Sequence, residues 1–133
     1  MSEENVEVVR RVFDAYNRGD LKGMLDHIAP ESEFRPSGRF MDSQQVYRGR
    51  EGWVDFWDTF RSAWESITIS IERIEDLGDQ VLVLGTFHGK GRGSGVEVSD
   101  EAAWLQTIQD GLFLHTVTFP SRAEALEAAG LAE

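Results

Sequence analysis

The hydrophobic pattern of the sequence changes its period near residue 66, and this change constrains the fold more than any other feature. Before it, apolar residues recur every three or four positions, as they do on one face of a helix. After it, Ile67, Ile69 and Ile71 alternate with polar residues, as in a strand with one buried face. Helices followed by strands predict the α+β class, in which an antiparallel sheet wraps around helices on one face.

Helices are predicted at the start of the chain. The helix over residues 2–18 has Ser2 as its N-cap and stops at Gly19. Asp20 then caps a short second helix, which Pro30 ends because proline lacks the amide hydrogen that the next turn needs.

A short strand is predicted over residues 33–35 and a long loop over 36–49. Residues 51–65 form a further predicted helix, and five aromatic side chains recur on one of its faces: Trp53, Phe56, Trp57, Phe60 and Trp64. An exposed stripe of this width would drive association, so this face is expected to be buried.

Strands are predicted over most of the second half, at 67–72, 81–88, 96–109 and 112–119, with a turn at 76–79 and a flexible glycine-rich connection at 89–95. Asp110-Gly111 separates the last two strands and favours a two-residue hairpin turn, since both residues can adopt positive φ. Ser121 and Glu124 form a capping box for a last helix, which Gly130 ends.

Composition narrows the classes of function. A chain of 133 residues has room for one domain, predicted over 1–133. Its net charge of −11 opposes binding of nucleic acid, and the absence of cysteine excludes disulfides and thiolate metal sites. No apolar run approaches the ~20 residues of a membrane helix. The acidic start lacks the features of a signal peptide, so we expect a cytoplasmic protein.

No motif implies a cofactor or a metal. The three histidines are scattered and no two of them are four residues apart, as metal ligands on one helix face would be. The glycine-rich residues 89–93 lack a following helix, so a phosphate loop is not expected.

The order of helices and strands, together with five short motifs, resembles the SnoaL-like family of the nuclear transport factor 2-like superfamily. The resemblance covers nearly the whole chain, and its motifs are Tyr16–Asp20, Tyr47–Gly52, Gly93–Val98, Asp110-Gly111 and Arg122–Gly130. It implies a cone-shaped, strongly curved sheet around an apolar pocket and a homodimer formed through the outer sheet face. Members include polyketide cyclases, ketosteroid isomerases, epoxide hydrolases and noncatalytic binders, so the resemblance predicts the fold and not the activity.

The known catalytic sets of these relatives do not transfer to this chain. Where ketosteroid isomerases have their basic aspartate this sequence has Pro36, and where they have the oxyanion-hole tyrosine it has Val12. The Asp-Arg-Asp set of the epoxide hydrolases is not found at matching positions. A cyclase-like activity stays open.

The hairpin turn predicts which side chains share a face of the sheet. If Gln109 pairs with Leu112, Gln106 lies opposite His115 and Trp104 lies opposite Val117. One face would then carry Trp104, Gln106 and Ile108 with Phe113, His115, Val117 and Phe119, a mixture of large apolar and few polar groups that is typical of a ligand cavity. A slip of one residue would overturn this assignment.

His115 is the candidate catalytic residue, because the ordinary pKa of histidine, about 6.5, is close to neutral pH. The competing interpretation is a structural histidine with a satisfied hydrogen bond. The predicted ligand-binding residues are Tyr16, Phe34, Trp57, Trp104, Gln106, Val117 and Phe119. Asp100 falls on the same nominal face, but about six residues of strand separate it from Gln106, so a pair with His115 is not expected, and a solvated charge at the strand end is the preferred interpretation.

Two functions follow from these residues. The first is a cofactor-independent enzyme that isomerises or cyclises a small hydrophobic carbonyl or polyketide-like compound by proton transfer. The alternative is a noncatalytic domain that binds a small apolar molecule or acts as a dimeric interaction module.

Overall fold

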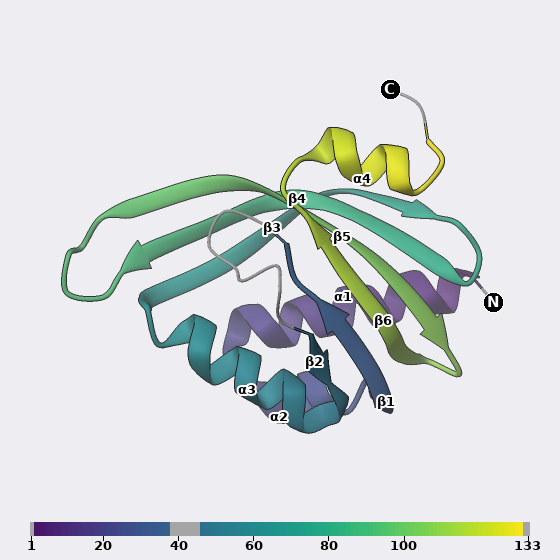
Figure 1. The fold of residues 1–133 in the computed structure, drawn as a ribbon, viewed down its shortest axis with the longest axis horizontal. Coiled ribbons are helices and arrows are strands. Elements are labelled where there is room, and N and C mark those ends of the chain that lie inside the picture. Colours follow the sequence, from purple (N-terminus) through teal and green to yellow (C-terminus); the bar gives the residue numbers. More distant parts are fainter. Residues whose placement is uncertain (1, 38–45, 132–133) are drawn as a thin grey trace.

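The computed structural model describes residues 2–37 and 46–131, which form helices on both sides of a sheet (Figure 1). In chain order the elements are α1 (Ser2–Arg18), α2 (Leu21–Leu25), β1 (Ile28–Arg35), β2 (Tyr47–Arg48), α3 (Gly49–Arg61), β3 (Trp64–Asp76), β4 (Gln80–Gly91), β5 (Glu97–Gln109), β6 (Leu112–Phe119) and α4 (Arg122–Ala128). None of these helices is long and apolar enough to cross a membrane.

The strands form one curved, mixed sheet in the order β2-β1-β6-β5-β4-β3. β1 and β6 run parallel, and the other neighbouring strands run antiparallel. The helices α1, α2 and α3 lie on one side of the sheet, here called the inner face, and α4 lies on the other, the outer face (Figure 1). The predicted α+β class is thereby confirmed.

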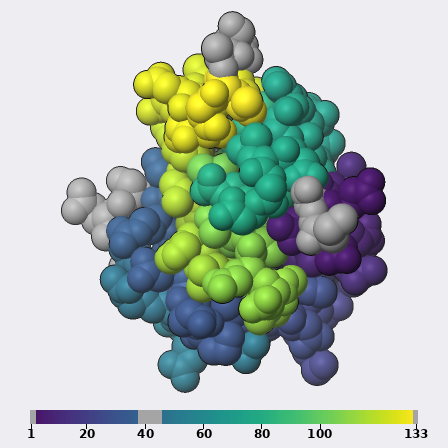
Figure 2. Space-filling view, turned by 90° about the vertical axis from the view of Figure 1, so that its right-hand side faces the viewer, coloured from purple at the N-terminus to yellow at the C-terminus, as the bar shows by residue number. Residues whose placement is uncertain are grey.

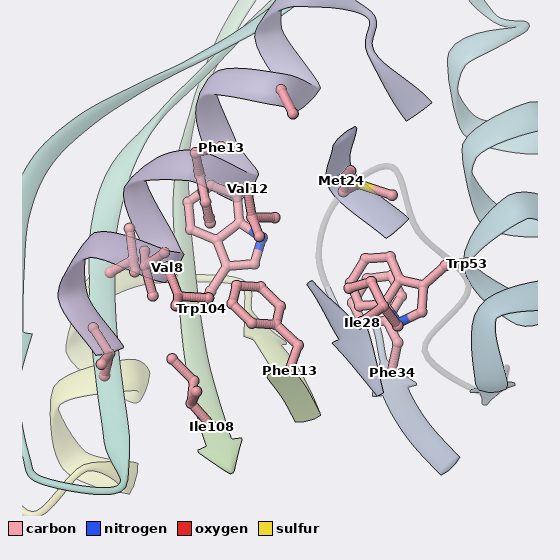
Figure 3. Packing of buried hydrophobic residues seen from close by; sticks show 14 residues of the cluster. Val8, Val12, Phe13, Met24, Ile28, Phe34, Trp53, Trp104, Ile108 and Phe113 are labelled. Atoms are coloured by element: carbon pink, nitrogen blue, oxygen red, sulfur yellow. The ribbon is translucent and has the colours of Figure 1, made fainter. Parts of the chain in front are cut away.

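Each face of the sheet has its own hydrophobic core. On the inner face, the apolar stripe of α1, which includes Val8, Val12 and Phe13, packs against alternate residues of β4, β5 and β6 (Figure 3). Val9 and Val83 are fully buried there. On the outer face, Leu126 of α4 packs against Leu82 and Leu84. Figure 2 shows α4 at one end of the molecule, against strands coloured teal and green. β4 therefore buries both of its faces, which explains its nearly continuous apolar sequence.

The prediction for the second helix is wrong in its last turn. Asp20 caps α2 as expected, since its Oδ1 accepts from the Gly23 amide at 2.9 Å. The helix ends at Leu25, however, and Pro30 lies within β1. Ile28 is fully buried opposite Phe113 of β6, and the pairing of β1 with β6 is irregular between Ile28 and Glu33, where a proline without an amide hydrogen is tolerated.

The boundaries of α3 and β4 also differ from prediction. The third predicted helix starts at Gly49 and ends at Arg61, so Trp64 is the first residue of β3 and not part of the aromatic helix face. β4 continues to Gly91 through part of the stretch predicted as a flexible connection. Gly89 is required there because a Cβ would lie 2.6 Å from the Trp64 ring. Most of the predicted loop over 36–49 lies outside the described residues.

The β5–β6 hairpin confirms the predicted turn and overturns the predicted register. Asp110 and Gly111 adopt φ values of 54° and 76°. The pairs Gln109 with Leu112 and Ile108 with Phe113 form as expected, but Thr107 then pairs with His115 and Gln106 with Thr116. This one-residue bulge moves every later side chain of β6 to the face opposite the predicted one.

The free edge of β3 is covered by a side chain of α1. Asn17 Nδ2 donates to the Ile69 carbonyl at 2.8 Å, and the Ile69 amide donates to Asn17 Oδ1 at 2.8 Å. The carboxamide thereby takes the place of a neighbouring strand at an edge that could otherwise pair with another chain.

Replacing Asn17 by Ala is expected to lower the free energy of unfolding by about 1 kcal/mol more than replacing Asn5 by Ala, because two hydrogen bonds are lost instead of one. Asn5 lies on the same helix and donates one bond to the Gly78 carbonyl at 3.0 Å. Both changes bring the same gain in helix propensity. Urea denaturation followed by circular dichroism measures the difference, and equal losses would contradict it.

Candidate functional site

A cavity of about 90 Å³ lies between the helices and the inner face of the sheet. Its walls come from α1, α2, α3, β1 and β3 to β6 (Figure 3). The lining is mostly aromatic and aliphatic: Val12, Phe13, Tyr16, Met24, Phe34, Trp53, Phe56, Phe60, Ile69, Phe87, Ala102, Ala103, Trp104, Phe113, Phe119 and Pro120. The polar residues of the lining are Ser37, Asp100, Glu101, Gln106 and Thr118.

Stacked aromatic rings fix the shape of two opposite walls. On one side, the Phe34 ring lies parallel to the Trp53 ring with centroids 4.5 Å apart, and Trp53 Nε1 donates to Ser32 Oγ at 3.1 Å. On the other side, Phe13 meets Trp104 edge to face at 4.8 Å. These contacts restrict the rotamers of the walls, so the cavity is preorganised.

Gln106 places an amide group in this apolar wall. The residue is 1% exposed, and its Oε1 accepts a hydrogen bond from Thr116 Oγ1 at 2.6 Å. This bond leaves Nε2 as the group that Gln106 can present to the cavity, and Nε2 donates to no other described residue. An amide N–H group at an apolar cavity is available to a water molecule or a ligand oxygen.

Trp104 adds a second donor on the same strand. Its Nε1 makes no hydrogen bond to any residue of the described ranges, although the side chain is only 8% exposed. In Figure 3 the indole nitrogen is turned toward the space between Phe113 and Met24. Ser37 and Thr118, by contrast, satisfy each other: the Ser37 amide donates to Thr118 Oγ1, which donates to the Ser37 carbonyl.

Tyr16 is a neutral phenol in the wall of the cavity. Burial raises the pKa of Tyr16 to about 12, and the Arg61 guanidinium opposes this shift. Arg61 Cζ lies 4.8 Å from the centroid of the Tyr16 ring and 4.4 Å from that of Trp57, so one cation stacks on both rings. At neutral pH the Tyr16 hydroxyl is therefore protonated and can donate.

Two carboxylates belong to the lining, on adjacent residues of β5. Asp100 is half-buried and lies on the inner face in the row that continues through Ala102 and Trp104 to Gln106. Glu101 is exposed, and its Oε1 accepts from the Arg122 amide at 3.1 Å. No Lys, Arg or His is among the described residues that line the cavity.

The structure brings five of the predicted ligand-binding residues to the cavity: Tyr16, Phe34, Trp104, Gln106 and Phe119. Phe119 does not share the inner face with Gln106 as predicted, because the bulge pairs it with Ala103 and it packs with the outer-face cluster. Trp57 lies behind the wall, where its ring meets that of Tyr16 at 5.4 Å. Val117 lies opposite Leu105 and outside the lining. Whether any of these residues binds a ligand stays a prediction.

The predicted placement of His115 is wrong. The bulge pairs it with Thr107 instead of Gln106, and its side chain is exposed on the outer face. Thr116 occupies the inner position and orients the Gln106 amide, a role that could not be inferred without the bulge. Asp100 lines the cavity, although the sequence favoured a solvated charge there. Within the described ranges, no three His, Asp or Glu side chains gather as a metal site.

Comparison with known proteins identifies a family and a fold. The sequence profile of the SnoaL-like domain matches residues 9–116. A candidate SnoaL-like polyketide cyclase from Jannaschia sp. CCS1 is similar in structure, with a TM-score of 0.77 and 22% identity over 96% of this chain and 91% of that chain. None of the curated proteins matches the sequence significantly.

Two further solved structures share the fold. IdmH from Streptomyces antibioticus, a candidate polyketide cyclase, has a TM-score of 0.75 and 21% identity over 96% of this chain and 99% of its own. TerC, co-crystallised with polyporic acid, has a TM-score of 0.79 and 16% identity over 96% of this chain and 98% of its own. At these identities the similarity shows the fold alone.

The pKa of Tyr16 predicts a loss of stability at high pH. Between the ordinary tyrosine pKa of 10.0 and the folded value of about 12, the unfolded chain loses the Tyr16 proton and the folded chain keeps it. The free energy of unfolding should therefore fall as the pH rises through this window. Chemical denaturation at a series of pH values, with Tyr16→Phe as the control, measures this contribution; an identical pH dependence in both proteins would contradict the burial of the phenol.

Proposed function

This chain belongs to the SnoaL-like domain family, and from that premise we propose that it binds a small, largely apolar molecule that carries a carbonyl-type oxygen. The observation that carries the proposal is the pair of N–H donors on two largely buried residues of the lining, Gln106 Nε2 and Trp104 Nε1, in a wall that is otherwise mostly apolar. Neither donor has a partner among the described residues, and a ligand oxygen between them would supply one.

The volume of the cavity limits the size of the ligand group that it can enclose. Its volume of about 90 Å³ is smaller than the roughly 150 Å³ of an engineered apolar cavity that holds benzene. The enclosed part is therefore no larger than a single ring or a short carbonyl-bearing group. The rest of the ligand would extend along the lining toward Asp100, Phe119 and Pro120.

The neighbours in structure support small organic ligands. TerC was co-crystallised with polyporic acid, and IdmH and the Jannaschia protein are candidate polyketide cyclases. We extend to this chain only the class of ligand, a carbonyl or polyketide-like compound. The homodimer and the cytoplasmic location expected from the sequence stay predictions.

Replacing Gln106 by Met is expected to weaken binding of acetophenone about tenfold, because a donor to the carbonyl oxygen is lost while the volume is nearly kept. The control ligand is α-methylstyrene, in which a methylene group replaces the oxygen; its affinity should change less than twofold. Titrations followed by protein NMR measure both dissociation constants, and the indole resonance of Trp104 reports on the cavity.

The Gln106→Met variant also removes the acceptor of Thr116 Oγ1, so the Thr116 hydroxyl is left without its hydrogen-bond partner. The double variant with Thr116→Val removes that unsatisfied hydroxyl, and circular dichroism checks that both variants fold. An equal loss of affinity for acetophenone and α-methylstyrene would mean that Gln106 shapes the cavity and does not bind the oxygen.

The second candidate function is acid–base catalysis, which the position of Asp100 in the lining favours. An Asp100 carboxylate could remove a proton from the carbon next to a ligand carbonyl that lies toward the Asp100 end of the lining, and the N–H group of Trp104, the nearer of the two donors along β5, would stabilise the enolate oxygen. Return of the proton to a different carbon would isomerise the ligand, and attack of the carbanion on a second carbonyl would cyclise it.

Proton removal predicts exchange of the methyl hydrogens of acetophenone for deuterium in D₂O, measured by NMR. Asp100→Asn should abolish the enzyme-dependent exchange, because the amide cannot take up the proton. His115→Ala, on the outer face, should leave it unchanged. Binding of acetophenone without exchange would favour the noncatalytic function, and loss of exchange in His115→Ala alone would contradict the assignment of the base.

A further inference from the structure

We propose that Ala102 determines which ligands this cavity accepts: it selects elongated carbonyl compounds, whose oxygen enters first and whose far end leaves the protein past the Ala102 methyl group. This inference rests on the proposed binding function and adds the shape of the ligand to it. It is carried by the change in exposure along β5 and by the pairing of Ala102 with a glycine that no other residue can replace.

Exposure falls along the inner-face row of β5. The row runs through Asp100, Ala102, Trp104 and Gln106, because alternate residues of a strand share a face. Asp100 and Ala102 are half-buried, whereas Trp104 and Gln106 are buried. Since all four residues line the cavity, the change in exposure indicates that the cavity opens to solvent near Ala102 and closes near Gln106.

Side chains outside β5 show the same change. Tyr16 of α1 and Phe60 of α3 pack against the same hydrophobic cluster as Ala102, around Phe87, and both are half-buried. Phe113, which lines the other end of the cavity, is 1% exposed. A carbonyl oxygen that reaches the donors therefore enters first, and the rest of the ligand passes between Ala102 and the helices.

The width of this passage depends on the residue at position 102. Ala102 pairs in register with Gly85 of β4, so two small residues lie side by side, between Trp104 in one direction and Phe87 in the other. A Cβ at Gly85 would lie 2.2 Å from the Ser70 carbonyl oxygen of β3, a distance that backbone atoms cannot accommodate. The sheet backbone therefore excludes a side chain from β4 here, and the side chain of residue 102 sets the remaining space.

The spacing along the row gives the shape of the ligand. Ala102 lies two residues before Trp104, which is about 7 Å along the strand. A phenyl ring attached to a carbonyl at the Trp104 N–H would lie beside the Ala102 methyl group, and a substituent in the para position would continue toward solvent. The closed part of the cavity, about 90 Å³, leaves no room for a substituent in the ortho position.

Two isomers of one tethered ketone test the direction of exit. Each is an acetophenone with a methoxy-tri(ethylene glycol) ether on the ring, in the para or the ortho position, and 4-methoxyacetophenone is the short reference. We expect the para isomer to bind within threefold of the reference, because its tether stays in water, and the ortho isomer to bind at least tenfold more weakly. Protein NMR titrations measure the dissociation constants.

Variants of Ala102 test the passage itself. Ala102→Leu should weaken binding of the para isomer at least tenfold, whereas 2-butanone, which needs only the closed end, should change less than threefold. Ala102→Val is a smaller step and should cause an intermediate loss. Ala128→Leu, at an exposed position of α4, adds the same atoms away from the cavity and should leave both affinities unchanged. Circular dichroism verifies that the variants fold.

The outcomes distinguish this inference from the function on which it rests. If the para and ortho isomers bind equally, or if Ala102→Leu and Ala102→Val weaken 2-butanone as much as the para isomer, Ala102 does not select the shape of the ligand while the binding function stands. If the natural chain binds none of these ketones, the proposed function falls, and the inference falls with it.

Discussion

Burial of the α1 stripe against the inner face of the sheet is the interaction on which the rest of the structure depends. Val9 is fully buried, and the Phe13 ring packs edge to face on Trp104. Because α1 covers the sheet from one side and the aromatic face of α3 closes it from another, the space between them is enclosed by large, rigid side chains (Figure 3). The cavity is what remains where these rings do not fill the curve of the sheet.

Polar groups in such a place have a cost that the fold must compensate. Thr116 satisfies the oxygen of Gln106 and thereby fixes the amide, but the nitrogen is left for the cavity. A purely structural core could hold apolar residues of similar volume at these two positions, whereas Gln106 and Trp104 place N–H groups in the lining of the cavity. Their presence supports the proposal that the cavity binds a ligand oxygen.

Charge is divided between the two sides of the sheet. On the outer face, Arg122 at the start of α4 pairs with Glu72 and also approaches Glu101, so α4 is tied to the sheet by ion pairs as well as by Leu126. On the inner face, Asp100 belongs to the lining of the cavity. The strand β5 thus supplies both the anchor for the helix and the acidic part of the candidate site.

The sequence by itself determined the elements, because their signals are local: the period of the apolar residues, the cap at Asp20, and the turn at Asp110-Gly111 all act within a few residues. The SnoaL-like fold and five cavity residues, among them Trp104 and Gln106, could be predicted from these patterns. Only the tertiary structure decided the orientation of β6. The bulge, between Thr107 and Ile108 on β5 and with Leu114 as the extra residue on β6, has no local signature; it arises from pairing and packing across strands, and the extra residue exchanges His115 for Thr116 at the inner face. The identity of the residues around the cavity therefore depends on a register that no local pattern encodes.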